Sequence, residues 1–265
     1  MTPWITKPIP FNIGQGAAGA SALPDIYPDS MGTDGDGDVS GATINTDDEI
    51  LGSGCLSFET DDYVTIGSAS DWTFLSNGGS MSVSYWIKDN DNDQSSRIIN
   101  TASDSGVNQS GFMLAHNADG SLGIYCRGDN NFPYSPDVAD VFTDTDWHHH
   151  CITFDGSSTL KFYLDASLTN TTTSGGTFDT GSPANELVMG KRVDNTRYLD
   201  SLLDDMVIFS GRVISSSEVT SLYNSGSGDL VSSVFAAGDR EALKVYYNFD
   251  ELDGSTLTNN AVPIE

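Results

Sequence analysis

Carboxylates dominate the residues of this chain that could do chemistry. An early acidic run places Asp34, Asp36 and Asp38 at alternate positions with glycines between them. This spacing is typical of the start of a calcium-binding loop, because Ca²⁺ prefers hard oxygen ligands. The run is not an EF-hand, since Val39 stands where that loop needs Gly and Asn45 where it needs a bidentate Glu. Two interpretations stay open: calcium ligation by some of these residues, or a solvated acidic turn.

Three consecutive histidines, His148, His149 and His150, form a second group with ligand chemistry. They lie in a run that alternates like a strand, so neighbouring side chains point to opposite faces. At most two of them could share a metal ion without help from elsewhere. The pattern therefore favours packing over a transition-metal site.

The overall charge excludes several classes of partner. The chain has 11 basic and 38 acidic residues, a formal net charge of −27. Such a charge disfavours binding to nucleic-acid phosphates or anionic lipid. The N-terminus has neither a signal-peptide pattern nor an apolar run long enough to span a membrane. We therefore expect synthesis in a cytoplasm without export by the usual secretory route. Cys55, Cys126 and Cys151 lie in strand-like runs and are interpreted as small buried hydrophobes.

Short runs of alternating apolar and polar residues predict an all-β chain. The predicted strands are Cys55–Ile66, Ser80–Lys88, Arg97–Thr101, Gly111–His116, Leu122–Arg127, His148–Phe154, Leu160–Asp165, Glu186–Lys191, Leu202–Ser210 and Ala242–Asp250. In the second of these, alternation puts Met81, Val83, Tyr85 and Ile87 on one face and Trp86 and Lys88 on the other. Asp155-Gly-Ser-Ser carries turn chemistry and predicts a hairpin between the sixth and seventh strands.

One helix is predicted at Ser215–Tyr223. Ser215 and Glu218 have the spacing of a capping box, and Gly226 and Gly228 end the helix. Before the strands, residues 1–28 hold five of the nine prolines and show no stable periodicity. We predict an extended arm that docks on a neighbouring subunit rather than a disordered tail, because it carries several large apolar residues: Trp4, Ile5, Ile9, Phe11 and Ile13.

Four segments in order resemble the laminin-G-like, concanavalin A-like jelly-roll family. The stretch WHHHCITFDG…LKFYLD resembles the family hairpin W-H-H-V-A-V-T-F-D-G…L-Y-V-D-G. Asp29–Ile66, Met81–Lys88 and Leu203–Asn224 resemble its opening, a middle strand and a late strand with the following helix. This chain departs at His150, at Cys151 and at Ala166, where the family usually has Gly and a two-residue primed turn favours φ > 0.

The resemblance implies a two-sheet antiparallel jelly-roll sandwich over residues 29–265, with one short helix. The last strand, which resembles a family opening strand, would complete the sandwich beside the first strand; the alternative is a truncated second repeat. Family members often hold a structural calcium at the rim of the sandwich. The carboxylates that match are Asp61, Asp62, Asp204, Asp205 and Asp250.

The resemblance also bears on function, because this fold hosts both lectins and glucanases. Glucanases carry a Glu-x-Asp-x-Glu strand. No such run occurs here, and no nucleophile motif or phosphate loop is found, so we predict no enzyme. Glycan binding needs aromatic platforms on outward faces or in loops. The candidates are Trp86, Lys88, Phe132, Tyr134 and Tyr163.

These observations lead to one functional prediction and one rival. The prediction is a non-enzymatic virion protein of a bacteriophage: a capsid decoration, head-fibre or tail-associated subunit. It would form a symmetric homo-oligomer, contact other virion proteins through its arm and present a lectin-like surface to host glycans. The rival is a free carbohydrate-binding module or adhesin domain of a secreted or cell-surface protein.

Overall fold

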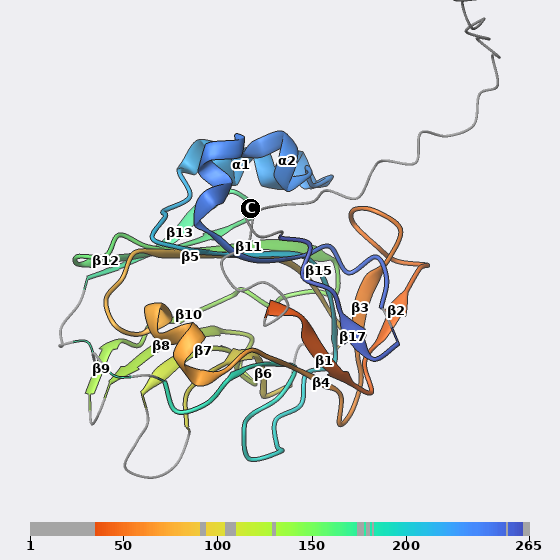
Figure 1. The fold of residues 1–265 in the computed structure, drawn as a ribbon, viewed down its shortest axis with the longest axis horizontal. Helices are drawn as coiled ribbons and strands as arrows, with labels where there is room; N and C mark the ends of the chain where they lie inside the picture. Colours follow the sequence, from red (N-terminus) through yellow and green to blue (C-terminus); the bar gives the residue numbers. More distant parts are fainter. Residues whose placement is uncertain are drawn as a thin grey trace, which may run out of the picture.

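Two antiparallel sheets face each other across an apolar core, and short helices cover the outer face of one of them (Figure 1). The structure is a computed structural model that describes residues 35–90, 94–103, 110–128, 131–173, 178, 181, 183–252 and 254–261. The predicted two-sheet antiparallel sandwich is confirmed. No helix within these ranges is long and apolar enough to cross a membrane.

The first sheet has nine strands among the described residues. Their order is β10-β8-β7-β6-β14-β4-β1-β17, with β9 also paired to β8. The strands are β1 (Gly37–Ser40), β4 (Tyr63–Ile66), β6 (Ser96–Asn100), β7 (Gly111–His116), β8 (Leu122–Gly128), β9 (Asn131–Tyr134), β10 (Asp137–Val138), β14 (Leu187–Met189) and β17 (Thr256–Leu257).

The second sheet has eight described strands. Their order is β13-β12-β11-β5-β15-β3-β2, and β16 also pairs with β15. The strands are β2 (Thr43–Asn45), β3 (Cys55–Phe58), β5 (Met81–Asp89), β11 (Trp147–Phe154), β12 (Thr159–Leu164), β13 (Ser167–Thr173), β15 (Ser201–Ser210) and β16 (Leu243–Tyr247). The helices are the α-helices α1 (Ser216–Tyr223) and α2 (Val231–Val234), and the 3₁₀ helices η2 (Ala69–Leu75), η3 (Asn224–Gly226) and η4 (Ala237–Ala242).

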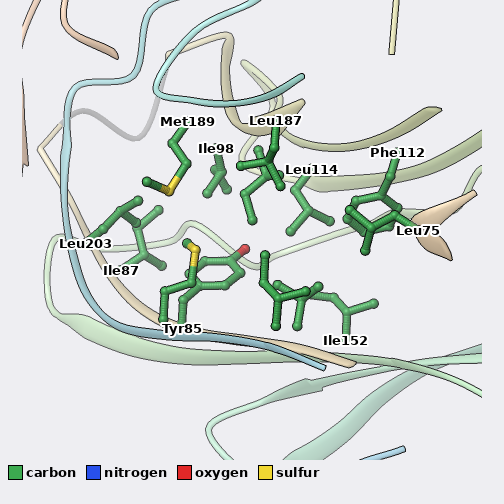
Figure 2. Close-up of a cluster of buried hydrophobic side chains, with 14 of the residues drawn as sticks. Leu75, Tyr85, Ile87, Ile98, Phe112, Leu114, Ile152, Leu187, Met189 and Leu203 are labelled. Atoms are coloured by element: carbon green, nitrogen blue, oxygen red, sulfur yellow. The ribbon is translucent and has the colours of Figure 1, made fainter. Parts of the chain in front are cut away.

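The main core lies between the sheets. The face of β5 that alternation assigns to the core is buried there as predicted, from Met81 to Ile87. Figure 2 shows Tyr85 and Ile87 of the second sheet opposite residues of the first, such as Leu114 and Met189. Burial of each such side chain contributes about 1.5–3 kcal/mol, which makes this cluster the main source of stability.

A second apolar cluster lies on the outer face of the second sheet. Strand residues such as Tyr163, Val207 and Phe209 pack there against α1 and α2, which contribute Leu222 and Val231 among others. The second sheet is therefore buried on both faces. This explains why all residues of β15 except the last are buried, although its sequence includes two aspartates.

The helix predicted after β15 is confirmed. The Ser215 side chain accepts a hydrogen bond from the backbone N–H of Glu218, and the Glu218 side chain accepts from the N–H of Ser215, which completes the capping box. Helix α1 ends at Tyr223 as predicted, but the residue that caps it is Asn224, with a left-handed φ of 44°, rather than Gly226 or Gly228. Helix α2 and the 3₁₀ helices were not predicted.

The segment 55–66 corrects one prediction. It was predicted as a single strand, but it forms β3 in one sheet and β4 in the other. The break lies at Glu59–Asp62, where Asp61 has φ of 77° and the backbone N–H of Glu59 donates to Asp62 Oδ2 at 2.9 Å. An Asp side chain that satisfies a local N–H favours a turn over continued pairing.

The C-terminal segment completes the sandwich, but with a different partner from the predicted one. Strand β16 pairs with β15 over Met206–Phe209, whereas β3 pairs with β15 over Ser201–Leu203. The last strand thus extends the line of the first strand along one edge of β15 instead of pairing beside it. The two-residue strand β17, which was not predicted, pairs with β1 in the other sheet.

Candidate functional site

A cleft of about 230 Å³ opens on the outer face of the second sheet, where the β11–β12 hairpin meets the segment that enters α1. We call it the hairpin cleft. It is smaller than the roughly 300–1,000 Å³ usual for drug-sized ligands, and so suits a ligand of about one ring. Its lining residues are Thr153, Asp155, Thr159, Lys161, Tyr163, Val213, Ile214, Ser215 and Ser216.

The hairpin supplies the floor of the cleft. Alternation along β12 puts Thr159, Lys161 and Tyr163 on one face, and Thr153 of β11 stands directly opposite Lys161. The hairpin turn is fixed by Asp155, whose Oδ1 accepts the backbone N–H groups of residues 157, 158 and 159 at 2.8–2.9 Å. The floor is thus a rigid two-stranded surface.

The segment before α1 forms the opposite wall. Ser82 Oγ on β5 donates to the carbonyl of Arg212 at 3.0 Å and accepts the N–H of Ile214 at 2.8 Å. These bonds fasten the wall to the sheet. Val213, between the two bonded residues, remains 41% exposed and offers an apolar surface to the cleft.

Two hydroxyls line the cleft without a protein partner. Thr153 is 2% exposed and Tyr163 is 5% exposed, and neither hydroxyl makes a hydrogen bond within the described part of the chain. Their oxygens are not among the described side-chain atoms that are both fully buried and unpartnered, so solvent reaches both of them through the cleft. Burial raises the pKa of Tyr163, so its hydroxyl stays protonated and able to donate. Both hydroxyls are therefore available to water or to a ligand in the cleft.

The cleft also contains one base and one acid. Lys161 is partly buried in the floor, whereas Asp155 is exposed at the hairpin end. Partial desolvation would raise the pKa of Asp155, but the hydrogen bonds from Thr159, Ser158 and Ser157 outweigh it and hold the pKa well below its ordinary value. Asp155 is therefore ionised at neutral pH and acts as an acceptor.

Of the predicted glycan-binding residues whose side chains the structure describes, only Tyr163 lines this cleft. Trp86 does lie on the outward face of β5, but it is 2% exposed. The ring of Tyr223 at the end of α1 stacks on it with centroids 5.7 Å apart and 22° between the planes. The expectation of an exposed Trp86 platform is therefore corrected, because α1 covers the ring.

The other predicted glycan-binding residues lie elsewhere. Lys88 Nζ forms an ion pair with Asp48 Oδ2 at 2.5 Å, so its charge is already matched. Phe132 and Tyr134 belong to β9, whose backbone pairs with β8, but their side chains lie outside the described part of the structure. The arm residues Trp4, Ile5, Ile9, Phe11 and Ile13 and the first acidic residue, Asp34, also lie outside the described ranges.

The described carboxylates that were predicted to hold calcium do not converge. Asp36 accepts the N–H of Asn259 at 2.8 Å, and Asp38 is exposed on β1. Asp61 and Asp62 form the turn between β3 and β4, and Asp250 accepts hydrogen bonds from Ser53. Within the described ranges no three His, Cys, Asp or Glu side chains are grouped as a metal site. The described residues therefore do not fit a calcium ion held by a cluster of carboxylates.

Asp204 and Asp205 lie at a bulge in β15, where Asp205 has φ of 49°. Asp204 Oδ2 accepts the N–H groups of Ile50 and Leu51 at 3.0 and 3.1 Å, while its buried Oδ1 has no hydrogen-bond partner in the described part of the chain. Burial, with a smaller contribution from the charge of Asp205, raises the pKa of Asp204 to about 8. Asp205 Oδ1 accepts the hydroxyl of Tyr246 at 2.7 Å. The pair therefore ties two other segments to the sheet.

Each of the three consecutive histidines has a different partner. His148 Nδ1 lies 2.7 Å from Asp165 Oδ2, His149 Nε2 lies 2.8 Å from Ser84 Oγ, and His150 Nδ1 lies 3.1 Å from the Tyr85 hydroxyl. Burial lowers the pKa of His149 to about 4 and that of His150 well below its ordinary value. This separation agrees with the predicted packing role.

Sequence reasoning missed most of the cleft. Alternation along the predicted strand Leu160–Asp165 puts Lys161 and Tyr163 on one face, and that shared face was the available signal. The opposite wall could not be found in this way, because it comes from a segment about 50 residues later in the chain, which the fold alone brings over the hairpin.

Comparisons with known proteins agree with the fold. A family model described as the concanavalin A-like lectin/glucanases superfamily matches residues 58–220. Domain 4 of an extracellular arabinanase from Geobacillus stearothermophilus, solved in complex with arabinotriose, is similar with a TM-score of 0.53 and 17% identity, over 69% of this chain and 86% of that one. No match was found among curated proteins.

Two toxin structures are also similar. One is of botulinum neurotoxin type C, whose cell entry is dependent upon interaction with two ganglioside molecules; it has a TM-score of 0.53 and 18% identity. The other is the binding domain of Paraclostridial Mosquitocidal Protein 1, with a TM-score of 0.53 and 15% identity. Both alignments cover 71% of this chain and 46% of the toxin chain, so this chain spans about half the length of those structures. At these identities the likeness shows the shared jelly-roll fold alone.

Proposed function

Because this chain belongs to the concanavalin A-like lectin/glucanases superfamily, we propose that it is a non-enzymatic carbohydrate-binding protein whose hairpin cleft holds one sugar residue of a glycan. The observation that carries the proposal is the pair of hydroxyls, on Thr153 and Tyr163, that open into the cleft without a partner in the described part of the chain. A sugar ring carries hydroxyls that both donate and accept, which matches this need.

The rest of the cleft supports the same ligand class. Asp155 supplies an ionised acceptor and Lys161 a donor, while Thr159, Ser215 and Ser216 add hydroxyls. Val213 and the Tyr163 ring provide apolar surface for the C–H groups of a sugar. Small polar clefts of this kind, with a few polar groups around an apolar surface, are typical of ligand sites.

The same chemistry argues against glycoside hydrolysis. Hydrolysis of a glycosidic bond uses two carboxyl groups across the scissile bond, one of them protonated to act as the acid. Among the described residues that line the cleft, Asp155 is the one carboxylate, and its lowered pKa keeps it ionised. The cleft can therefore bind a sugar but lacks the pair of carboxyl groups needed to cleave one.

A glycan array tests the proposal. The full chain and the double variant T153V/Y163F, which removes the two hydroxyls with little change in shape, would be compared at equal concentration. We expect the variant to lose roughly 5- to 150-fold in affinity, since each of the two lost hydrogen bonds is worth about 0.5–1.5 kcal/mol. The control T65V/Y198F makes the same chemical changes outside the cleft and should bind like the parent.

Folded parent protein that binds no glycan would refute the proposal, as would a double variant that binds with parental affinity. Each array would be run with calcium and again with a chelator. This second arm tests the structural calcium, which rests on the sequence pattern and the family resemblance. Loss of binding with chelator would support a calcium-dependent lectin.

We also propose that the protein acts as part of a bacteriophage virion, attached through residues 1–28 and assembled as a symmetric homo-oligomer. The support is the sequence of the arm, where several large apolar side chains accompany five prolines. Gene neighbours test this proposal. Capsid and tail genes beside this gene would support it, whereas polysaccharide-degrading enzymes would favour the rival, a free carbohydrate-binding module.

A further inference from the structure

We infer that the sugar residue in the hairpin cleft carries a carboxylate, as a uronic or sialic acid does, and that this carboxylate pairs with Lys161. The inference rests on the proposed function and specifies the ligand class of the same site. It follows from two observations. Lys161 has no hydrogen-bond or ion-pair partner among the described residues, and hydrogen-bond donors exceed acceptors in the cleft.

Lys161 is unpaired in a chain where acids are abundant. Acidic residues outnumber basic ones by 38 to 11, and other bases such as Lys88, Arg192 and Arg212 do form ion pairs. Among the basic side chains that the structure describes, Lys161 and Lys244 have no hydrogen bond, ion pair or ring contact. Lys244 lies outside the cleft, where its charge contributes to lowering the pKa of Asp71. The unpaired charge inside the cleft is therefore that of Lys161.

The described lining of the cleft offers more hydrogen-bond donors than its own acceptors can satisfy. Lys161 is a donor only, and the hydroxyls of Thr153 and Tyr163 are free to donate. Ser216 is the first residue of α1, so its backbone N–H is one of the donors that an α-helix leaves without an intrahelical acceptor. Asp155 is the one anionic acceptor on the described lining, and its Oδ1 is already occupied by three N–H groups. A carboxylate is an acceptor only, so an acidic sugar restores the balance better than a neutral one.

The net charge of −27 repels an anionic ligand at long range, whereas Lys161 attracts its carboxylate at contact distance. At physiological ionic strength, interactions between exposed charges are largely screened beyond about 8 Å. A carboxylate in contact with a partly buried ammonium is screened much less. The contact with Lys161 therefore decides binding in the cleft, provided that the salt concentration is physiological.

The test is an array at physiological salt that carries uronic- and sialic-acid-containing oligosaccharides, each beside its own methyl ester. The ester keeps the sugar ring and removes the negative charge. We expect the parent protein to bind at least one acid about tenfold more tightly than its ester. In the variant K161Q, that preference should disappear while affinity for the ester is retained. K244Q, which makes the same charge change outside the cleft, should keep the preference.

The possible failures are distinguishable. Equal or tighter binding of the esters by the parent would overturn this inference and leave the proposed function intact. A preference that K161Q retains, or that K244Q loses equally, would also overturn it, because the charge of Lys161 would not be its source. Absence of binding to every acid, ester and neutral glycan by folded protein would overturn both.

Discussion

Asp165 Oδ2 lies 2.7 Å from His148 Nδ1, and Asp165 Oδ1 accepts the backbone N–H of His149 at 2.9 Å. A single carboxylate in the turn after β12 therefore holds the beginning of β11. The hydrogen bond that His148 donates to Asp165 is the main cause that raises the pKa of His148 to about 9. Burial lowers this pKa, and a second hydrogen bond, to Asp144, raises it further. At neutral pH the pair is an imidazolium and a carboxylate.

The first prediction concerns this pair and pH. Because the folded-state pKa of His148 exceeds its unfolded value of about 6.5, its contribution to stability is complete below pH 6.5 and is lost as pH rises through 9. We expect Asp165→Asn to lower the free energy of unfolding by about 1–2 kcal/mol at pH 6 and by much less at pH 10. Urea denaturation at both pH values measures this. Asp144→Asn, at an exposed partner of His148, should have a smaller effect, and equal losses at both pH values would contradict the prediction.

The second prediction concerns the turn after β12. Ala166 has φ of 62°, in the left-handed region where a Cβ is unfavourable, so this alanine adopts the conformation that favours glycine. We expect Ala166→Gly to stabilise the protein by about 0.5–1 kcal/mol, because the relief of strain exceeds the entropy that glycine gains in the unfolded chain. Thermal unfolding measures the change. Ala118→Gly, in a turn where φ is not positive, should be neutral or destabilising.

The third prediction concerns Asp204. Burial raises its folded pKa to about 8, so its contribution to stability is lost as pH rises through 8. Asp204→Asn keeps an acceptor for the N–H groups of Ile50 and Leu51 without the buried charge. Between pH 7 and 9.5 we expect parental stability to fall by about 1–2 kcal/mol more than that of the variant. The difference between the two isolates Asp204, since His148 titrates in both. If the free energies of unfolding of the parent and the variant fall equally over this pH range, ionisation of Asp204 does not lower the stability of the fold, which would contradict the prediction.

The fourth prediction concerns the capping box beside the cleft. Ser215 caps the N-terminus of α1 and also lines the hairpin cleft. Ser215→Ala removes the side-chain acceptor of the Glu218 N–H and should cost about 1 kcal/mol of stability. It should also weaken glycan binding, because the wall of the cleft is less firmly held. Ser221→Ala, at an exposed position of α1 outside the box, is the control in thermal unfolding and in the array.

Local pattern predicted most of the longer strands that stay within one sheet, but it missed β13, whose one large apolar residue is Leu168. Strand β7 has its predicted bounds, and the hairpin and α1 lie where turn and capping residues indicated. Residues 55–66 were harder, because alternation continues on both sides of Asp61 and does not reveal that the chain crosses from one sheet to the other. The strands β1, β2 and β17 have two to four residues each, too few for a period to appear.

The site was only partly predictable for a related reason. Periodicity assigned Trp86 and Tyr163 to the outward face correctly, but it cannot tell what covers that face. Tyr223, more than 130 positions later, covers Trp86, and the segment before α1 turns the surface around Tyr163 into a cleft. Lys161 became significant only when the structure left it without a partner.

The pairing of β1 with β17 has a consequence for biosynthesis. Gly37 pairs with Leu257, so one of the earliest described strands completes its pairing only after about 220 further residues have been made. At 5–20 residues per second, the interval between the synthesis of these two strands is roughly 10–40 s. Until β17 is made, β1 can pair with β4 alone. In the same way, part of one edge of β15 stays open until β16 is made. A ribosome-bound chain therefore presents open strand edges, and stalling before residue 257 should favour aggregation or capture by a chaperone.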